Sequence, residues 1–344
     1  MPTSKPSPIL PTYEKQYDRF RKPFHRVGNI SIRKPWLRNL AINLRDFFIA
    51  TWLDWVTILM IGATAAGVAV APHTFTRYFP VTSPDGAVYW PELAYPYIEP
   101  IFSSVIAGVL AALVPISVFL LAQLWQQSFV DFASAVLGLT YSLITGTCFQ
   151  VILKKTIGGL RPHFLFVCKP VLPPSDGSTG AGLRSTMYTV EQVCTGNPDK
   201  INNGLESFPS GHAEVAFAGF GYLAIYLFTH LRITSLSRKR GSHWRMLLVV
   251  APLLFATYLA SSLVLGYHHH GYDVVFGALI GWLVAFMGYR MVFMGIIDGR
   301  WNTVPYLKLR PTEEDVSQNS NALGSSEMAT AHSAGEPEAG SLPV

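Results

Sequence analysis

The sequence predicts an all-α fold, a bundle of six membrane-spanning helices. Half of the 344 residues are hydrophobic and only 14% are charged, whereas a soluble domain has about a quarter of its residues charged. The charged residues also cluster, and between the clusters lie apolar stretches of about 18 residues or more, long enough to cross a bilayer as helices. These observations predict a multi-pass integral membrane protein.

The six expected spans lie at about residues 52–71, 101–125, 129–153, 209–231, 246–265 and 274–297. The fourth begins at Pro209-Ser210-Gly211-His212, where Pro209 can precede a helix and Ser210 is a good N-cap. Asp131, near the start of the third span, is expected at the membrane–water interface. Between the third and fourth spans, residues 156–208 form a long polar loop rich in Gly, Pro, Ser and Thr.

The residues outside the spans divide the chain into three parts. Residues 1–46 hold ten Lys and Arg and few apolar residues, and we expect a basic, mostly disordered tail. Residues 47–297 form the six-span membrane domain. Residues 298–344 are rich in Ser, Ala, Gly and Glu, and we expect an acidic, disordered tail.

Basic residues predict the topology. The segment 232–245 holds five Lys and Arg and no acidic residue, and such segments favour the cytosolic side, as the basic N-terminal tail does. Six spans then place both termini in the cytosol. The loops at 72–99, 156–208 and 266–273 fall together on the extracytosolic or lumenal side. The sequence does not indicate which organelle membrane holds the protein.

The charge and the cysteines narrow the classes of partner. The net charge of +5 comes from the chain ends and one loop, with no basic patch interleaved with aromatic residues, so we expect no nucleic-acid binding. Cys148 lies in an apolar run and is interpreted as a core residue. Cys168 and Cys194 lie in the long loop, and either a disulfide or two separate thiols fits them. The oligomeric state stays open.

Two motifs suggest a phosphate site. Lys154 and Arg161 bracket a Gly-Gly turn that Pro162 ends, and a guanidinium fork suits bidentate contact with phosphate. We interpret the neighbouring Lys155 as a charge at a helix end. In the second motif Gly211 allows close backbone approach to a ligand, and His212 lies in a first helical turn, where an anion is favoured.

A third motif suggests proton transfer. His269 and Asp273 are four residues apart, so on a helix they share a face, and the carboxylate would fix the imidazole tautomer and leave the other nitrogen free. With His212 as a second imidazole, one histidine can serve as nucleophile and the other as general acid. A metal site at residues 268–270 is the alternative, disfavoured because neighbouring helical residues do not face one site.

The three motifs resemble those of the type 2 phosphatidic acid phosphatase superfamily, the lipid phosphate phosphatases. The family pattern is Lys-x6-Arg-Pro, then Pro-Ser-Gly-His, then Ser-Arg-x5-His-x3-Asp, and residues 154–162 and 209–212 match the first two fully. In the third, Ser262, His269 and Asp273 match, but Leu263 stands in the place of the arginine. The loop at 79–96 also resembles fungal diacylglycerol pyrophosphate phosphatases.

The resemblance implies a haloperoxidase-like helical core and a metal-independent phosphatase, with no cofactor. It implies that His269 attacks phosphorus, Asp273 orients it, and His212 protonates the leaving group. Phosphate binding would fall to Lys154, Arg161, Ser210 and Gly211. The expected substrate is a lipid phosphate in the bilayer, such as phosphatidate or diacylglycerol pyrophosphate, with the lipid left open.

Leu263 supports a second hypothesis, a catalytically impaired protein that binds lipid phosphates or acts as a scaffold. Loss of one charged donor to a transition state typically lowers the rate about 10²- to 10³-fold. Reduced activity is therefore expected even if the protein is a phosphatase. A six-span transporter is disfavoured because charged residues are scarce inside the expected spans.

Overall fold

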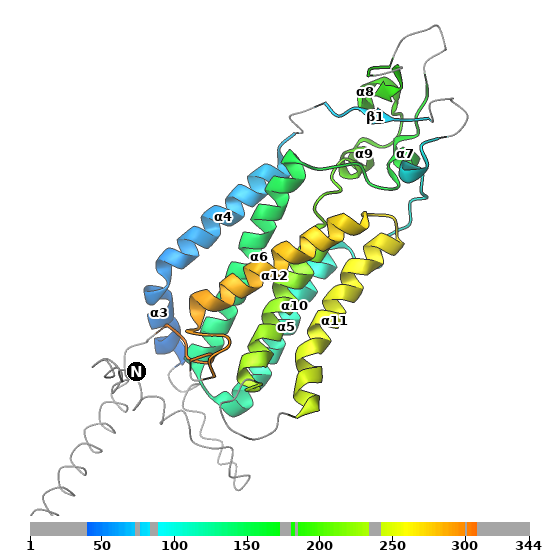
Figure 1. Cartoon of the computed structure of the whole chain (residues 1–344). Coiled ribbons are helices and arrows are strands. Elements are labelled where there is room, and N and C mark those ends of the chain that lie inside the picture. Colours follow the sequence, from blue (N-terminus) through cyan, green and yellow to red (C-terminus); the bar gives the residue numbers. More distant parts are fainter. Residues whose placement is uncertain are drawn as a thin grey trace, which may run out of the picture.

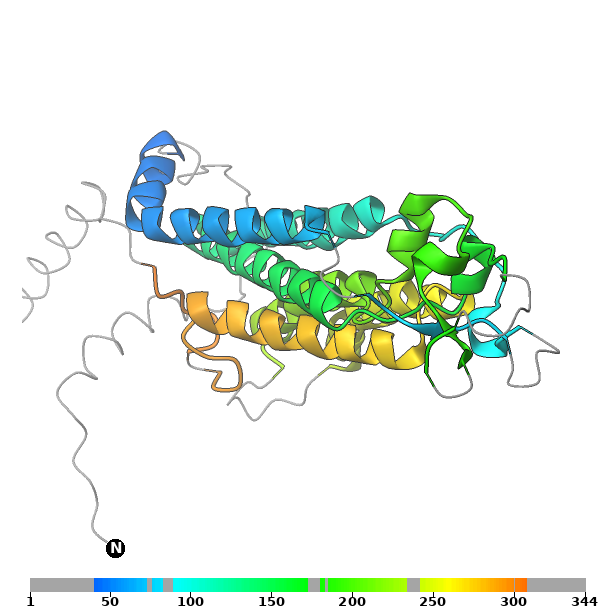
Figure 2. The same cartoon turned by 90° about the horizontal axis from the view of Figure 1, so that it is seen from above.

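The computed structural model describes residues 40–72, 76–82, 89–172, 180–182, 185–233, 242–299 and 301–307. Long helices run side by side as a bundle, and a group of short helices and strands covers one end of it (Figures 1 and 2). The expectations for the two tails fall mostly at residues 1–39 and 308–344, which lie outside the described residues.

Among the described residues, five helices are long and apolar enough to cross a membrane: α4 (Trp52–Val70), α5 (Ser104–Gln126), α6 (Phe129–Thr156), α11 (His243–Leu265) and α12 (Gly271–Val292). The expected count of six spans is therefore not met on this criterion. The expected fourth span forms helix α10 (Gly211–His230), 20 residues long, within the same bundle (Figure 1). Its first turns carry His212 and Glu214, and it is not among the five helices that meet the criterion.

Helix α10 tolerates polar residues because it is the central helix. It packs against α5, α6, α11 and α12, and most of its residues are buried. Glycines allow close packing: a Cβ at Gly219 would overlap the Ala111 carbonyl oxygen, and one at Gly221 would lie 2.9 Å from the Trp282 ring. A helix enclosed by protein needs no lipid-facing apolar surface, so its polar side chains can face the interior of the bundle.

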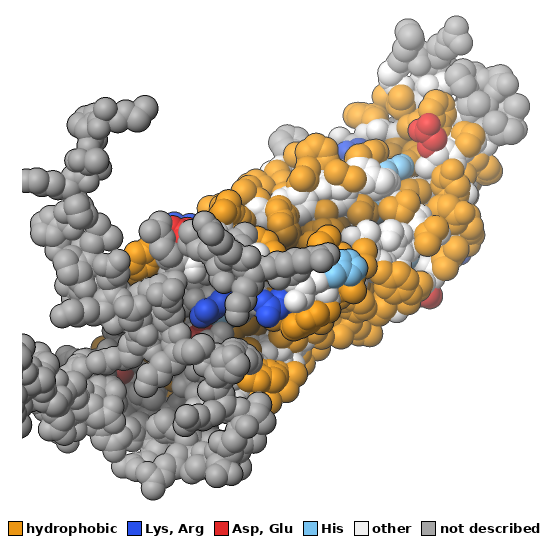
Figure 3. Space-filling view, turned by 60° about the horizontal axis from the view of Figure 1, so that its bottom comes forward, with side chains coloured by type: hydrophobic (Ala, Val, Ile, Leu, Met, Phe, Trp, Pro, Cys, Tyr) orange, Lys and Arg blue, Asp and Glu red, His pale blue; other side chains and the backbone are white. Residues whose placement is uncertain are grey.

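The surrounding helices present apolar side chains outward. Hydrophobic groups cover most of the described bundle surface in Figure 3. Exposed examples, one each from α4, α5, α11 and α12, are Leu59, Val105, Leu254 and Leu279. In water so large an apolar surface would promote association, whereas in a bilayer it faces lipid chains.

A further helix, α3 (Leu40–Ala50), lies at the end of the bundle away from the short loop elements (Figure 1). It meets α4 at Thr51, whose hydroxyl donates to the Phe47 carbonyl at 2.8 Å. The Phe47 ring packs edge-on against Trp55 and Phe129, with centroids 6.5 and 6.3 Å away. Aromatic packing therefore attaches the segment before the first span to the bundle.

The sixth expected span ends earlier than residue 297, because α12 ends at Val292. Phe293 is extended and pairs with Pro305, and the Tyr289 hydroxyl donates to the Asn302 carbonyl at 2.7 Å. These contacts fold the chain back onto the bundle, so the described residues after the last span are packed rather than free.

Asp131 is also placed differently from the expectation, since it is buried among polar partners. Its carboxylate accepts from the Tyr226 hydroxyl at 3.0 Å and the Gln123 amide at 3.2 Å, and His230 Nε2 lies 2.9 Å away. A buried carboxylate is tolerated when it is paired and hydrogen-bonded, and these partners come from α5 and α10, whereas Asp131 is on α6. The network ties three helices together at the end nearest α3.

The loop elements form a small unit with its own core. They are η1 (Pro91–Leu93), α7 (Phe164–Cys168), α8 (Val190–Val193), α9 (Pro198–Gly204), and the strands β1 (Phe79–Pro80) and β2 (Met187–Tyr188), which pair antiparallel. Phe79 and Phe164 are fully buried in this core. Cys168 and Cys194 form a disulfide, which decides between the two alternatives.

Candidate active site

The first motif turns the chain back over the end of the bundle. Lys154 stands in the last turn of α6, and Gly158 and Gly159 follow with φ of 54° and 140°, a region that favours glycine. The Gly159 amide donates to the Leu205 carbonyl at 3.0 Å, and the Arg161 amide donates to Gly204 at 2.9 Å. The Gly-Gly turn thus returns Arg161 toward Lys154, where the guanidinium is buried.

The second motif begins α10 as expected. The Ser210 hydroxyl accepts from the Ala213 amide at 3.5 Å, as an N-cap does, and the Ser210 amide donates to the Asp273 carbonyl at 3.0 Å. The second bond fixes the second motif against the third. Gly211 leaves no room for a side chain, because a Cβ there would lie 3.1 Å from Gln150 Nε2.

The third motif is not helical at His269, contrary to the premise of a shared helical face. The chain leaves α11 through a turn in which the amides of His268 and His269 both donate to the Leu263 carbonyl, at 2.8 and 3.3 Å. Helix α12 begins only at Gly271, and Asp273 caps it by accepting from the His270 amide at 2.9 Å.

The turn nevertheless brings the expected pair together. His269 Nδ1 lies 3.7 Å from Asp273 Oδ2, and both side chains are almost fully buried. The Ser207 hydroxyl also donates to Asp273 Oδ2. Neither His269 Nδ1 nor Asp273 Oδ1 has a hydrogen-bond partner among the described residues. Catalytic hydrogen bonds are often long without substrate, so this distance suits an orienting pair.

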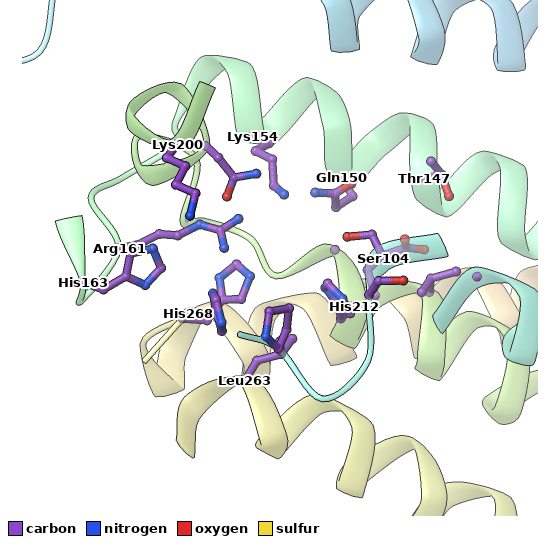
Figure 4. A pocket seen from close by; sticks show the side chains of 18 of the residues that line it. Ser104, Thr147, Gln150, Lys154, Arg161, His163, Lys200, His212, Leu263 and His268 are labelled. Atoms are coloured by element: carbon purple, nitrogen blue, oxygen red, sulfur yellow. The ribbon is translucent and has the colours of Figure 1, made fainter. Parts of the chain in front are cut away.

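Residues from all three motifs line one cavity of about 630 Å³ (Figure 4). The expected residues on its wall are Lys154, Arg161, Gly211, His212 and His269. Ser210 and Asp273 are not among the lining residues and lie behind the wall, where they cap helices and support His269. The structure therefore gathers five of the seven predicted residues at the cavity and two in support.

The cavity wall is prepared for an anion. Burial lowers the pKa of Arg161 to about 10, which still leaves it charged at neutral pH. Burial, together with the charges of Arg161 and Lys154, lowers the pKa of His269 well below its ordinary value. Arg161 Nε is buried without a partner among the described residues. A buried guanidinium with an unpartnered nitrogen suits a phosphate ligand, and a neutral imidazole suits a nucleophile.

Leu263 lines the same cavity near the end of α11, with only 2% of its surface exposed. In Figure 4 its side chain lies near His268. The position that departs from the family pattern is thus at the cavity, and it contributes an apolar wall where the pattern has a cation.

Sequence reasoning missed several polar residues that the structure places at the cavity: Tyr97, Gln150, His163, Lys200, Glu214 and His268. Gln150 stands one helical turn before Lys154, and that spacing was a usable signal. Glu214 was an acidic residue inside an expected span, which is a functional signal by itself. The others come from loops whose folding the sequence pattern does not specify.

The structure also bears on Lys155 and on the alternative of a metal site. Lys155 forms an ion pair with Glu206 at 2.9 Å and is not among the residues that line the cavity. Within the described ranges, no group of three or more His, Cys, Asp or Glu side chains is placed to hold a metal ion.

Comparisons with known proteins agree with the motifs. A family profile described as the PAP2 superfamily matches residues 135–296. The chain is 32% identical over 289 residues to Lipid phosphate phosphatase 2 of Arabidopsis thaliana, covering 83% of this chain and 92% of that protein. It is 33% identical to Lipid phosphate phosphatase 1 of the same plant, covering 78% of each chain.

A fungal relative shares a shorter region. Diacylglycerol pyrophosphate phosphatase 1 of Saccharomyces cerevisiae is 35% identical over 166 residues, which is 48% of this chain and 54% of that protein. No solved structure matches. With the matches to the plant proteins covering most of both chains, and with the three motifs on one cavity, the chain belongs to the PAP2 superfamily.

Proposed function

We propose that the protein is an integral membrane lipid phosphate phosphatase that releases phosphate through a phosphohistidine intermediate, without a metal. The observation that carries the proposal is the convergence of Lys154, Arg161, His212 and His269 on one cavity at the end of an apolar bundle. The names of the relatives support a lipid phosphate or diacylglycerol pyrophosphate as substrate.

In the first step a ring nitrogen of His269 attacks phosphorus, and the bond from phosphorus to the lipid oxygen breaks. His212 gives its proton to the departing alkoxide. Lys154 and Arg161 hold the phosphoryl oxygens, and the amide of Gly211 at the start of α10 adds a donor. Asp273 steadies the charge that develops on His269, since its Oδ2 faces Nδ1.

In the second step water attacks the phosphohistidine, and His212 accepts the proton of that water. The bond from phosphorus to nitrogen breaks, inorganic phosphate leaves, and both imidazoles return to their starting state. Fixed cations and helix-end donors perform the charge stabilisation that Mg²⁺ provides in other phosphatases.

The test is phosphate release by the purified protein from a panel of lipid phosphates with EDTA present. Release should survive chelation and be inhibited by vanadate, and His269→Ala should be inactive. Rapid quenching with labelled substrate should trap acid-labile, base-stable phosphate on the wild type and none on His269→Ala. Equal trapping on both proteins would exclude His269 as the nucleophile, and activity lost in EDTA and restored by Mg²⁺ would exclude the metal-free reaction.

A second candidate function is the binding of lipid phosphates with little or no turnover. Leu263 favours it, because an apolar side chain lines the cavity where the family pattern has an arginine. The retained His212, His269 and Asp273 favour the enzyme, since binding alone would not require them.

Leu263→Arg distinguishes the two candidates. A guanidinium at the cavity wall would add a charge-assisted bond to a phosphoryl oxygen, so we expect kcat/KM to rise about 10- to 10³-fold. Leu263→Met, similar in volume, should leave the rate near that of the wild type. A folded Leu263→Arg no faster than wild type would show that Leu263 is not the missing clamp. Wild-type activity equal to that of His269→Ala would favour the binding protein.

A further inference from the structure

Below the phosphate-binding residues, the cavity continues along α6 and α10 and is lined by polar side chains that the proposed reaction does not use. Gln150 and then Thr147 follow the phosphate-binding Lys154 toward the start of α6, each about one turn from the last (Figure 4). Ser104 of α5 and Glu214 of α10 also line this part. The inner part of the cavity is therefore built to hold a polar group, although it lies among helices that face lipid.

Glu214 is the acidic residue of this inner part. It is 1% exposed, and its Oε1 has no hydrogen-bond partner among the described residues. Within the described ranges Glu214 also forms no ion pair. Asp131, at the other end of the bundle, differs because both of its carboxylate oxygens have partners. A buried carboxyl without partners costs free energy, so its retention calls for a ligand that supplies a donor.

The neighbouring helix makes room for this carboxyl. A Cβ at Gly146 of α6 would overlap Glu214 Oε1, so glycine is required at that position for the side chain to adopt its place. Gln150, also buried, lines the cavity beside it with an amide that can donate or accept. Glu214 and Gln150 thus face one space from two helices.

The spacing indicates which part of a lipid would reach them. Gln150 lies four residues before Lys154, which is about 6 Å along a helix. In a lipid phosphate, the carbon next to the phosphoester carbon carries an oxygen or a nitrogen. That atom lies four bonds from phosphorus, about 5 Å away when the chain is extended. A phosphate held by Lys154 and Arg161 would therefore place that substituent near Gln150. Glu214 approaches the same place from α10, because it follows Gly211 by three residues, less than one helical turn from the amide that would bind the phosphate.

We propose that Glu214, with Gln150, is a specificity site that selects lipid phosphates carrying a free hydrogen-bond donor, a hydroxyl or an ammonium, on the backbone carbon next to the phosphoester carbon. The inference rests on the proposed phosphatase function. It favours lysophosphatidate and sphingoid base phosphates over fully acylated phosphatidate, whose corresponding oxygen is esterified and cannot donate.

The experiment compares kcat/KM for matched substrates in detergent micelles. One pair is 1-acyl lysophosphatidate and its analogue that lacks only the free hydroxyl, and a sphingoid base 1-phosphate provides the ammonium. The wild type should prefer each donor-bearing lipid about 10- to 100-fold over the deoxy analogue, the range for a hydrogen bond to a charged group. Glu214→Leu should abolish both preferences, so that the donor-bearing lipids and the deoxy analogue are hydrolysed with similar kcat/KM.

Two further variants distinguish the source of the donor and the role of position. Glu214→Gln keeps an acceptor oxygen without the charge, so it should keep the hydroxyl preference and lose most of the ammonium preference. Gly146→Ala displaces the carboxyl without removing it and should resemble Glu214→Leu in selectivity. Glu191→Gln, an exposed acid on α8, is the control and should behave as wild type.

The outcomes separate this inference from the proposed function. If the wild type matches His269→Ala on every lipid, the phosphatase function itself fails. If the wild type is active and Glu214→Leu keeps the same ratio between the hydroxyl-bearing lipid and its deoxy analogue, the specificity site is overturned. Removing an unpaired buried carboxyl should not lower the melting temperature. A Glu214→Leu that melts earlier and loses all substrates equally would assign Glu214 a structural role and also overturn the inference.

Discussion

At the scale of single residues, Asp273 has more than one task. Its Oδ2 accepts from the His270 amide and the Ser207 hydroxyl and faces His269 Nδ1 at 3.7 Å. Capping holds the carboxylate at the start of α12, so the same bonds that begin the helix also position the group beside the imidazole. A substitution at Asp273 is therefore expected to affect both stability and catalysis, by different amounts.

Asp273→Asn tests this double role. The amide keeps an oxygen for the His270 N–H, so the cap is only weakened. The free energy of unfolding should fall by about 1 kcal/mol or less, and the melting temperature should fall only slightly. The amide carries no charge to stabilise a cationic imidazole, so kcat should fall about 10²- to 10⁴-fold. Thermal unfolding and phosphate release measure the two effects.

Ser207→Ala is the matched control for Asp273→Asn, because it removes one donor to the carboxylate and leaves the charge in place. It should lower kcat by about tenfold or less. Equal losses of activity in the two variants would contradict an electrostatic role for Asp273.

The environment of His269 predicts a pH dependence. Burial and the charges of Arg161 and Lys154 lower its pKa, and only the neutral imidazole is a nucleophile. The competent form is present above the lowered pKa, so it persists to more acidic pH than an ordinary histidine near pH 6.5 would allow. The acid limb of kcat/KM against pH should accordingly lie below pH 6.5, and a limb above that value would contradict the assigned environment.

Residue-level sequence patterns predicted much of the site. Lys154, Arg161, His212 and His269 were expected to share a site, and they line one cavity. The helical premise for His269 was wrong, because the glycine-bounded turn between α11 and α12 depends on contacts with Leu263 that a four-residue spacing does not reveal. Ser210 was expected both to cap α10 and to bind phosphate. Its hydroxyl accepts from the Ala213 amide, as a cap does, and its contact with phosphate stays a prediction.

At the scale of elements, the loop unit positions cavity residues that no periodicity could predict. Helix α9 contributes Lys200 and Asn203 to the cavity wall, and the Gly204 carbonyl at its end accepts from the Arg161 amide. The Cys168–Cys194 disulfide holds the segment before α9 against α7, across a separation of 26 residues. The disulfide thus stabilises the unit that places Arg161.

Removal of this disulfide should therefore affect both the loop unit and the site. In Cys168→Ala with Cys194→Ala, the free energy of unfolding of the loop unit should fall by about 3 kcal/mol, the value for a closed loop of this size. Looser placement of Arg161 should raise KM more than it lowers kcat. Thermal unfolding and steady-state kinetics test this, with Cys148→Ala as the control that keeps the bridge. Unchanged kinetics in the double variant would show that the disulfide does not support the site.

Helix α10 is the element whose surroundings the sequence did not reveal. Its position in the chain and its N-cap were expected, but its central place, packed against four other long helices, was not. Hydropathy reports what a helix needs when it faces lipid, and α10 faces protein instead. The same burial explains how Glu214 can stand inside the bundle, and why Asp131 is part of a buried network rather than at an interface.

At the scale of the whole molecule, the bundle has two unlike ends. One carries the cavity and the loop unit, and the other carries α3, the Asp131 network, the end of α10 and the start of α11 (Figure 1). The described parts of the basic segments 1–46 and 232–245 lie at the second end, in α3, at the end of α10 and at the start of α11. Basic segments favour the cytosolic side, so we propose that the cavity opens on the extracytosolic or lumenal side.

Labelling of single introduced cysteines tests this orientation. Ser185 is exposed in the loop unit, and Ser242 is exposed just before α11 at the opposite end, where its side chain makes no capping bond. Ser185→Cys and Ser242→Cys, each in a chain with Cys148→Ala, should fold because neither side chain is buried. A membrane-impermeant thiol reagent applied to sealed vesicles should reach position 242 from the cytosolic face and position 185 only from the other face or after permeabilisation. Labelling of both positions from one face would contradict the arrangement, and reversed labelling would place the cavity in the cytosol and require a substrate in the cytosolic leaflet.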